Sequence, residues 1–208
     1  MYVPKYFEVT DRAQLFEFIN ANSFGILFSS VDGNSIATHL PILADCVSGQ
    51  LWGHMAKANE HWKHFAGDKA SEALFVFHGP HAYISPTWYG EANAVPTWNY
   101  AAVHVYGKVS LIENKDELTG LLQRTVTLYE SPQPQPWTML GLTPEFIDKM
   151  LGAIVGFKFE ITRMEGKWKL NQNRSQAAQA RVVEELKKSA YESERQVAAL
   201  MENNLKEG

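Results

Sequence analysis

Residues 95–107, VPTWNYAAVHVYG, alternate as a β-strand does, and they give that strand two faces of different character. Successive side chains of a strand point to opposite faces of its sheet. The odd positions are small or branched apolar residues: Ala101, Val103, Val105 and, further on, Val109. The even positions carry rings and a charge: Trp98, Tyr100, His104, Tyr106 and Lys108. We therefore expect one face to fill a core and the other to need a cover that also forms hydrogen bonds.

The composition is that of a globular protein and not of a nucleic-acid-binding domain. The 208 residues are 45% hydrophobic and 20% charged, with a formal net charge of -4. A protein that neutralises DNA phosphates carries a basic stripe. Here the only local excess is five basic against two acidic residues between positions 158 and 174. That segment suits an anion, and a phosphate group fits it as well as a nucleic acid does.

The sequence gives no indication of secretion or of a membrane span. The single cysteine, Cys46, excludes an internal disulfide and favours a reducing compartment. The first residues, MYVPKYFEVTD, lack the apolar core of a signal peptide. No apolar run approaches the ~20 residues that cross a bilayer. We expect a soluble, cytoplasmic protein.

Strand patterns follow one another between residues 24 and 112. The turn signal VDGNS joins residues 24–30 to 36–43 as a hairpin. Gly79-Pro80 is expected to be a turn between two further strands. With the opening stretch, these segments form a meander of about six strands, as in a sandwich or barrel. A later hairpin is expected over residues 154–173, with its turn at Glu165-Gly166.

Helix signals flank this meander. The first helix has Thr10 or Asp11 as its N-cap. A second follows Asn114 as its N-cap and ends before the prolines of SPQPQPW. A third has Thr143 as its N-cap and Pro144 at its first position.

The C-terminal residues are also helical in pattern, as one helix or as two. The predicted fold class is therefore α+β, mainly β. We expect a barrel domain over residues 1–174 and a C-terminal helical extension over 175–208 packed on it.

Histidines are the remaining candidates for a metal site, because one cysteine cannot supply a zinc finger or a zinc deaminase. Two pairs stand close in sequence: His61 with His64, and His78 with His81. The first pair lies in EHWKH, which has the pattern of the exposed part of an amphipathic helix. No carboxylate is spaced to complete a site, so we expect no metal. Dinucleotide, triphosphate and nucleophile-elbow motifs are absent as well.

Five blocks stand together in one order: THLPIL, GHMAKANEHW, FHGPHAYISPTWY, VPTWNYAAVHVYG and VGFKFEITRMEGKWKLNQNRS. From Met1 to about Val183 the set closely resembles the PaiB family, described as FMN-binding negative transcriptional regulators. The resemblance implies an FMN-binding split barrel, as in pyridoxamine-phosphate oxidase: six antiparallel strands with peripheral helices. It also implies a homodimer with flavin between the subunits. Asn171 departs from the pattern, since a serine is expected there.

The resemblance gives the two faces of residues 95–107 a purpose. One face of every strand fills the interior of a small barrel, and the valine face suits it. The aromatic face is then covered by the second subunit and the flavin, because an uncovered apolar patch would promote association. The alternative is that Trp98, Tyr100 and Tyr106 pack under the helices.

FMN requires an apolar slot with hydrogen-bonding groups for its ring. THLPIL suits the ring, and the cofactor-binding residues predicted there are Thr38, His39, Leu40 and Pro41. Thr38 and His39 can donate hydrogen bonds, and Pro41 suits a strand edge or bulge because it has no N–H. The alternative for His39 is a strand histidine bonded to a neighbouring carbonyl.

The phosphate of FMN requires cations, amides or a helix N-terminus. In GHMAKANEHW a strand ends at His54 and a helix begins near Asn59, which places Lys57 and Asn59 at a helix start. The resemblance also places phosphate ligands on this segment. The alternative is that Asn59 is only an N-cap and Lys57 a solvated charge.

Four more residues complete the predicted cofactor set. Trp98 and Asn99 are expected to contact the flavin of the other subunit. Lys169 and Arg174, in the basic segment, are candidates for a second phosphate clamp.

Three functions remain open. The resemblance implies a negative regulator of sporulation and degradative-enzyme genes. Residues 175–208 hold five basic and six acidic residues, so a helix in the major groove is not favoured over indirect action or a regulatory protein partner. The second function is an FMN-dependent oxidoreductase acting on a small molecule, with His39, His54 or His104 as proton donor. The third is a split barrel that has lost its flavin and serves as a dimeric interaction module.

Overall fold

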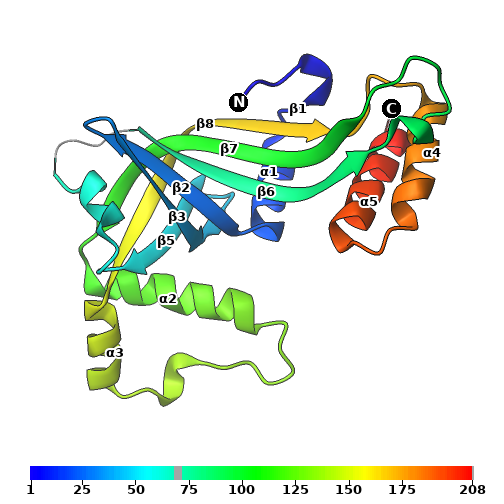
Figure 1. Cartoon of the computed structure of the whole chain (residues 1–208). Coiled ribbons are helices and arrows are strands. Elements are labelled where there is room, and N and C mark those ends of the chain that lie inside the picture. The colour runs from blue at the N-terminus through cyan, green and yellow to red at the C-terminus, as the bar shows by residue number, and fades with distance from the viewer. Residues whose placement is uncertain (68–71, 208) are drawn as a thin grey trace. The chain divides into compact units, whose positions relative to one another are not determined.

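The computed structural model describes residues 1–67 and 72–207. The strands in these ranges form one sheet in the order β3-β2-β6-β7-β8-β5-β4, and β1 pairs with β8 (Figure 1). The strands are β1 (Glu8–Val9), β2 (Phe24–Val31), β3 (Asn34–Pro41), β4 (Leu43–Asp45), β5 (Gln50–Ala56), β6 (Glu72–Ile84), β7 (Thr97–Ile112) and β8 (Ile154–Lys169). The described sheet therefore has eight strands and not six. β1 and β4, of two and three residues, are short additions to six longer strands.

The β2–β3 hairpin is confirmed. Its two turn residues, Asp32 and Gly33, have φ values of 52° and 80°. Positive φ at both central residues is the signature of the tight turn that matches the twist of a hairpin. The pairing runs antiparallel from Val31↔Asn34 to Phe24↔Pro41.

The predicted turn at Gly79-Pro80 is wrong, because β6 runs through it. Phe77 and Gly79 are buried, and so is Ala82, but Pro80 and His81 both point outward. Such a break in alternation is a β-bulge, which accommodates a proline that cannot donate to the ladder. The backbone of His81 is satisfied instead by Ser193 of α5: its N–H donates to Ser193 Oγ (2.9 Å), and Ser193 Oγ donates to the His81 carbonyl (2.8 Å).

The predicted turn at Glu165-Gly166 is also wrong, because β8 is continuous from Ile154 to Lys169. Gly166 pairs with Val9 of β1. A Cβ at this glycine would lie 2.3 Å from Leu15 Cδ2 and 2.8 Å from the Val9 carbonyl oxygen. The glycine therefore allows close approach of the N-terminal segment and does not reverse the chain.

The alternation of the opening stretch is confirmed along β7 apart from Ala102, which is buried as well. Ala101, Val103, Val105 and Val109 are buried, whereas Trp98 and Lys108 are exposed and Tyr100, His104 and Tyr106 are half-buried. Gly107 lies between these positions on the buried face. A Cβ there would stand 2.1 Å from the Glu160 carbonyl oxygen of β8, so this glycine lets the two strands approach closely.

The helices begin where their caps predict. They are η1 (Lys5–Phe7), α1 (Arg12–Ala21), η2 (Glu60–Phe65), η3 (Pro86–Trp88), α2 (Lys115–Glu130), η4 (Met139–Gly141), α3 (Pro144–Gly152), α4 (Gln176–Lys187) and α5 (Glu192–Glu207). Asp11, Asn114 and Thr143 accept from backbone N–H groups in the first turns of α1, α2 and α3. The C-terminal segment is two helices. No helix in the described part of the chain combines the length and the apolar content needed to cross a bilayer.

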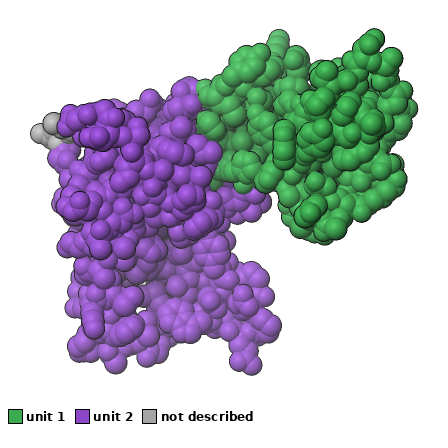
Figure 2. Space-filling model, in the orientation of Figure 1, with its two compact units in different colours: residues 1–18, 77–104, 165–208 green, residues 19–76, 105–164 purple. Residues whose placement is uncertain are grey.

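The chain forms two compact units (Figure 2). The terminal unit comprises residues 1–18, 77–104 and 165–208, and the central unit comprises residues 19–76 and 105–164. β6, β7 and β8 contribute residues to both.

Each unit has its own packed interior. In the central unit, the Phe75 ring centroid lies 6.2 Å from that of Phe157 and 5.2 Å from that of Phe159. A second apolar cluster underlies α2 and α3: Ile112, Leu118, Leu121 and Leu151. In the terminal unit, Phe18 packs on Trp168, and α4 and α5 bury Val182, Leu186, Val197 and Met201.

Candidate functional site

The segment that follows β5 in the central unit is fixed by its own hydrogen bonds. The Asn59 side chain accepts from the His61 N–H (3.1 Å) and caps η2, which confirms that a helix begins there. The Lys57 N–H donates to the Ala153 carbonyl (2.8 Å), and Trp62 Nε1 donates to the Lys57 carbonyl (2.9 Å). The backbone of Lys57 is therefore held on both sides, while its side chain is exposed.

His61 is the centre of a buried network that joins β2, β3 and η2. Its Nδ1 is 2.7 Å from Thr38 Oγ1, and its Nε2 is 2.9 Å from Ser29 Oγ. Ser29 Oγ also lies 2.8 Å from His64 Nδ1, and Asn59 Nδ2 donates to Thr38 Oγ1 (3.2 Å). Two predicted residues, Thr38 and Asn59, are thus brought together by His61, which the sequence analysis considered only as part of a metal pair with His64.

The expectation that EHWKH is the exposed part of a helix is wrong. His61 has no exposed surface, and Phe65 is buried one turn later. Burial, with the nearby charge of His64 adding to it, lowers the pKa of His61 to about 4. The ring is therefore neutral at pH 7, so that one nitrogen donates and the other accepts. The i, i+4 spacing of His61 and Phe65 was the available signal, because it puts both on one side of a helical segment.

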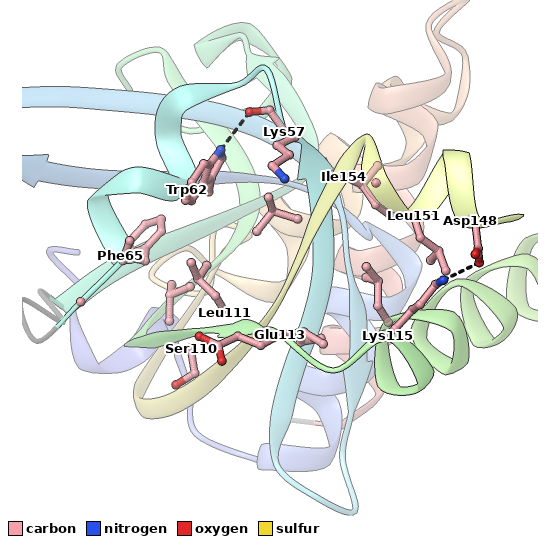
Figure 3. A pocket seen from close by; sticks show the side chains of 17 residues that line it. Lys57, Trp62, Phe65, Ser110, Leu111, Glu113, Lys115, Asp148, Leu151 and Ile154 are labelled. Atoms are coloured by element: carbon pink, nitrogen blue, oxygen red, sulfur yellow. Dashed lines mark hydrogen bonds and ion pairs between the residues drawn. The ribbon is translucent and has the colours of Figure 1, made fainter.

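Beside this network lies a groove of about 810 Å³ in the central unit, a volume within the usual range for small-molecule sites. Figure 3 shows the Lys57 ammonium pointing into it, with Trp62 and Phe65 on one wall and Leu151 and Ile154 on another. Its polar rim includes Glu113 and the ion pair between Lys115 and Asp148. Of the predicted cofactor residues, only Lys57 lines this groove.

The ring-binding block lies on β3, the last strand at one end of the described sheet order, which confirms the expected strand edge at Pro41. His39 is exposed and stacks on Phe24 of β2, with ring centroids 6.0 Å apart. Leu40 points inward and is buried. The block therefore offers one exposed ring and one core residue.

His54 lies on β5, paired with Gly156 of β8. It is half-buried, and burial lowers its pKa. A neutral imidazole at this position can accept or donate a hydrogen bond without a charge to compensate.

The other predicted residues lie in the terminal unit. Trp98 is 54% exposed, and its carbonyl accepts from Lys169 Nζ. Asn99 is fully buried and donates to Met201 Sδ (3.4 Å). Arg174 stacks over Tyr89 and lies 3.7 Å from a Glu91 carboxylate oxygen. Contact of Trp98 and Asn99 with a flavin of another subunit stays a prediction, as does the phosphate clamp of Lys169 and Arg174.

Several groove residues were missed by sequence reasoning. Trp62 and Phe65 belong to η2, whereas Lys115 and Asp148 come from α2 and α3, fifty or more residues later. Only the fold brings them together. Only Trp62 had a local sequence signal that could have placed it near the site, because it lies two residues before His64 in the helix that Asn59 caps.

Comparisons with known proteins match this architecture. A family model described as "Putative FMN-binding domain" matches residues 1–163. The chain is 40% identical over 208 residues to "Protease synthase and sporulation protein PAI 2" of Bacillus subtilis, and the alignment covers 99% of each protein.

Two solved structures share the fold at low sequence identity. The flavocytochrome Anf3 of Azotobacter vinelandii has a TM-score of 0.59 at 13% identity, covering 80% of this chain and 72% of that one. The FAD and heme binding protein of Mycobacterium smegmatis has a TM-score of 0.56 at 14% identity, covering 78% and 73%.

Acidification should destabilise the protein through His61. A histidine with a pKa near 4 when folded and 6.5 when unfolded binds its proton first in the unfolded state. Stability is then complete above pH 6.5 and is lost as the pH falls towards 4, by at most about 3 kcal/mol. Urea unfolding at several pH values would measure this, with His61→Gln compared to the exposed His39→Gln. We expect a shallower pH dependence for His61→Gln only; an unchanged slope in that variant would contradict the assignment.

Proposed function

The chain belongs to the FMN-binding family, with a split-barrel fold and FMN as its cofactor, and on that premise we propose that it is a flavin-dependent negative regulator of sporulation and degradative-enzyme genes. The support for regulation is the relative in Bacillus subtilis, whose printed name joins protease synthesis to sporulation. The observation that supports flavin binding is the groove into which Lys57 points.

The residues of the groove fit a flavin mononucleotide. A phosphate dianion needs a cation, and Lys57 points into the hollow. No carboxylate among residues 1–67 and 72–207 forms an ion pair with Lys57. A flat apolar ring needs apolar walls, and Trp62, Phe65, Leu111, Leu151 and Ile154 provide them. We infer that Lys57 holds the phosphate and Trp62 packs against the ligand; when bound, FMN supplies two-electron chemistry.

The buried network sets the position of this cation. His61 braces Thr38, and Thr38 receives the amide of Asn59, whose oxygen caps η2. The neutral ring does this without bringing a competing positive charge to the segment. Thr38 and Asn59 would thus act by positioning Lys57 and Trp62 and not by touching the phosphate.

We also propose that two copies associate through the outer face of β2, β3 and β6. The register places Phe24, Ile26 and Phe28 of β2 beside Pro41, His39 and Ala37 of β3, and Ile26 and Phe28 beside Val76 and Leu74 of β6. Phe24 is 65% and Phe28 37% exposed. A continuous apolar sheet face of this kind is typical of an interaction surface.

Regulation by this chain would be indirect. α4 and α5 expose both signs of charge, and two of the three lysines in this segment are ion-paired: Lys187 with Glu184 and Glu202, and Lys188 with Glu185. A recognition helix presents unpaired basic side chains to DNA. A regulatory protein partner that responds to the flavin state fits these helices better than DNA does.

An FMN-dependent oxidoreductase is the alternative. The observation that favours it is the half-buried position of His54 on β5 and of His104 on β7, and burial is the main cause that lowers both pKa values. A lowered pKa makes an imidazole a weaker proton acceptor in water but keeps it neutral at pH 7, so these rings would serve as acceptors of a proton from the substrate rather than as donors.

The fluorescence of FMN should be quenched when it binds the protein. Lys57→Ala should weaken that binding by roughly tenfold or more, because a charge-assisted contact to the phosphate is lost. Fluorescence titration of FMN measures it. Lys63→Ala removes a lysine of η2 that is already paired with Glu60 and should leave the affinity unchanged. Riboflavin, which has no phosphate, should bind both variants alike. Equal FMN affinity for the wild type and Lys57→Ala would remove Lys57 from the site.

The double substitution Phe24→Glu with Phe28→Glu should give a monomer, because two charges would lie in an apolar contact. Light scattering at micromolar concentration measures the mass. Val47→Glu, at a position 94% exposed, is the matched control and should remain dimeric. A wild-type protein that is monomeric throughout would refute the dimer.

The regulatory role predicts that deletion of the gene raises expression of a degradative-enzyme reporter. Complementation with the wild type should lower it again, and Lys57→Ala should not, because repression would need the flavin. Equal repression by Lys57→Ala would show that the flavin is not required. Sustained consumption of NADH or NADPH by FMN-loaded protein would favour the oxidoreductase instead.

A further inference from the structure

The terminal unit holds two lysines that its own charges do not balance. Lys167 and Lys169 are alternate residues of β8 and therefore lie on the same face. Lys167 is only 8% exposed. A lysine buried to this degree is nearly always paired with a carboxylate or another anion.

The partners of both ammonium groups are neutral. Lys167 Nζ donates to the Tyr2 carbonyl (3.0 Å) and lies 5.3 Å from the ring centroid of Tyr100 on β7. Lys169 Nζ donates to Thr97 Oγ1 and to the Trp98 carbonyl. Carbonyls, a hydroxyl and a ring face can solvate a cation but do not cancel its charge.

The surrounding charges make the imbalance larger. Within the described ranges, neither lysine forms an ion pair with a carboxylate. The acidic residue two positions earlier, Glu165, is engaged by the amino group of Met1. Burial, and after it the positive charge of Lys167, lowers the pKa of Lys169. Two like charges in a half-buried place are costly unless a ligand neutralises them.

We propose that Lys167 and Lys169 bind a phosphate-type dianion distinct from the phosphate of FMN, and that the Tyr2 carbonyl occupies the position of one ligand oxygen until that ligand arrives. Two cations match a double negative charge. Their backbone positions are about 6.5 Å apart along the strand, a span that flexible lysine stems close easily on one tetrahedral group. Thr97 Oγ1 supplies a further donor at the same place.

The N-terminal segment can give way to such a ligand. Residues 1–4 have no regular secondary structure, and the Tyr2 side chain is 84% exposed. Terminal segments without regular structure are the ones that separate most readily, and a ligand would have to replace the contacts of the Tyr2 carbonyl and ring with Lys167 while the Met1 pairing with Glu165 could stay. Tyr100, Thr97 and the β-strand backbone would remain in place, so the site is preformed apart from Tyr2, whose carbonyl and ring both lie against Lys167.

Calorimetric titration of FMN-loaded protein with inorganic phosphate, in a phosphate-free buffer, tests this proposal. We expect one site per chain, weakened at least about tenfold in Lys167→Met with Lys169→Met, since two charge-assisted contacts are lost. Methionine keeps an unbranched apolar stem and removes the charge. Lys188→Met, which removes an exposed ion-paired lysine, should bind as the wild type does. Circular dichroism melts confirm that the variants fold.

A second measurement needs no variant. Limited acetylation followed by mass spectrometry should label Lys169 less in the presence of phosphate, and Lys188 equally in both conditions. Absent phosphate binding, or equal binding by the double variant, would overturn the proposal. So would weaker binding of FMN but not of riboflavin by the double variant, because the lysines would then belong to the flavin phosphate.

Discussion

The buried ring of His61 is the constraint on which the candidate site depends. An imidazole without exposed surface must find a partner for each nitrogen inside the protein, and it finds Ser29 on β2 and Thr38 on β3. Since the backbone N–H of the same residue donates to the cap of η2, two strands and a helix are joined through one residue. The positions of Lys57 and Trp62 follow from it, because Lys57 lies between the end of β5 and that cap and Trp62 lies in η2 directly after it.

Much of the fold could be predicted from the sequence because the features concerned depend on neighbouring residues alone. The β2–β3 turn needs only two residues that tolerate positive φ, and Asp32-Gly33 supply them. The caps of α1, α2 and α3 need one side-chain oxygen three residues before its donor. The two faces of β7 follow from alternation alone. Each of these was visible in the sequence.

The failures share a different cause, since a distant residue decides each outcome. Gly79-Pro80 is a turn signal by composition, yet Ser193, more than a hundred residues later, satisfies the bulged His81 and keeps the strand going. The sequence around Gly166 is typical of a turn, but in the fold Val9 and Leu15 pack so closely against this position that only a glycine fits. His61 belongs with these, because Ser29 and Thr38 are invisible from EHWKH. Lys57 was found as a helix-start cation, but the groove around it needed α2 and α3.

The lysines of the chain give the physical argument for where ligands act. Lys63, Lys115, Lys158, Lys187 and Lys188 each lie beside a carboxylate. Exposed pairs of this kind contribute little to stability, and they give no indication of a ligand site. An unpaired lysine on the open surface explains little either, because water solvates it. The lysines that indicate an anion-binding site are those held against apolar walls or aromatic rings with only neutral partners. Such a lysine loses hydration on folding and gains no ion pair in return. Lys167 and Lys169 under Tyr2 meet that description, and an anion brought from outside would remove the imbalance there. Lys57 is exposed, and the reason to propose it as a phosphate ligand is instead that its ammonium points into a groove with apolar walls.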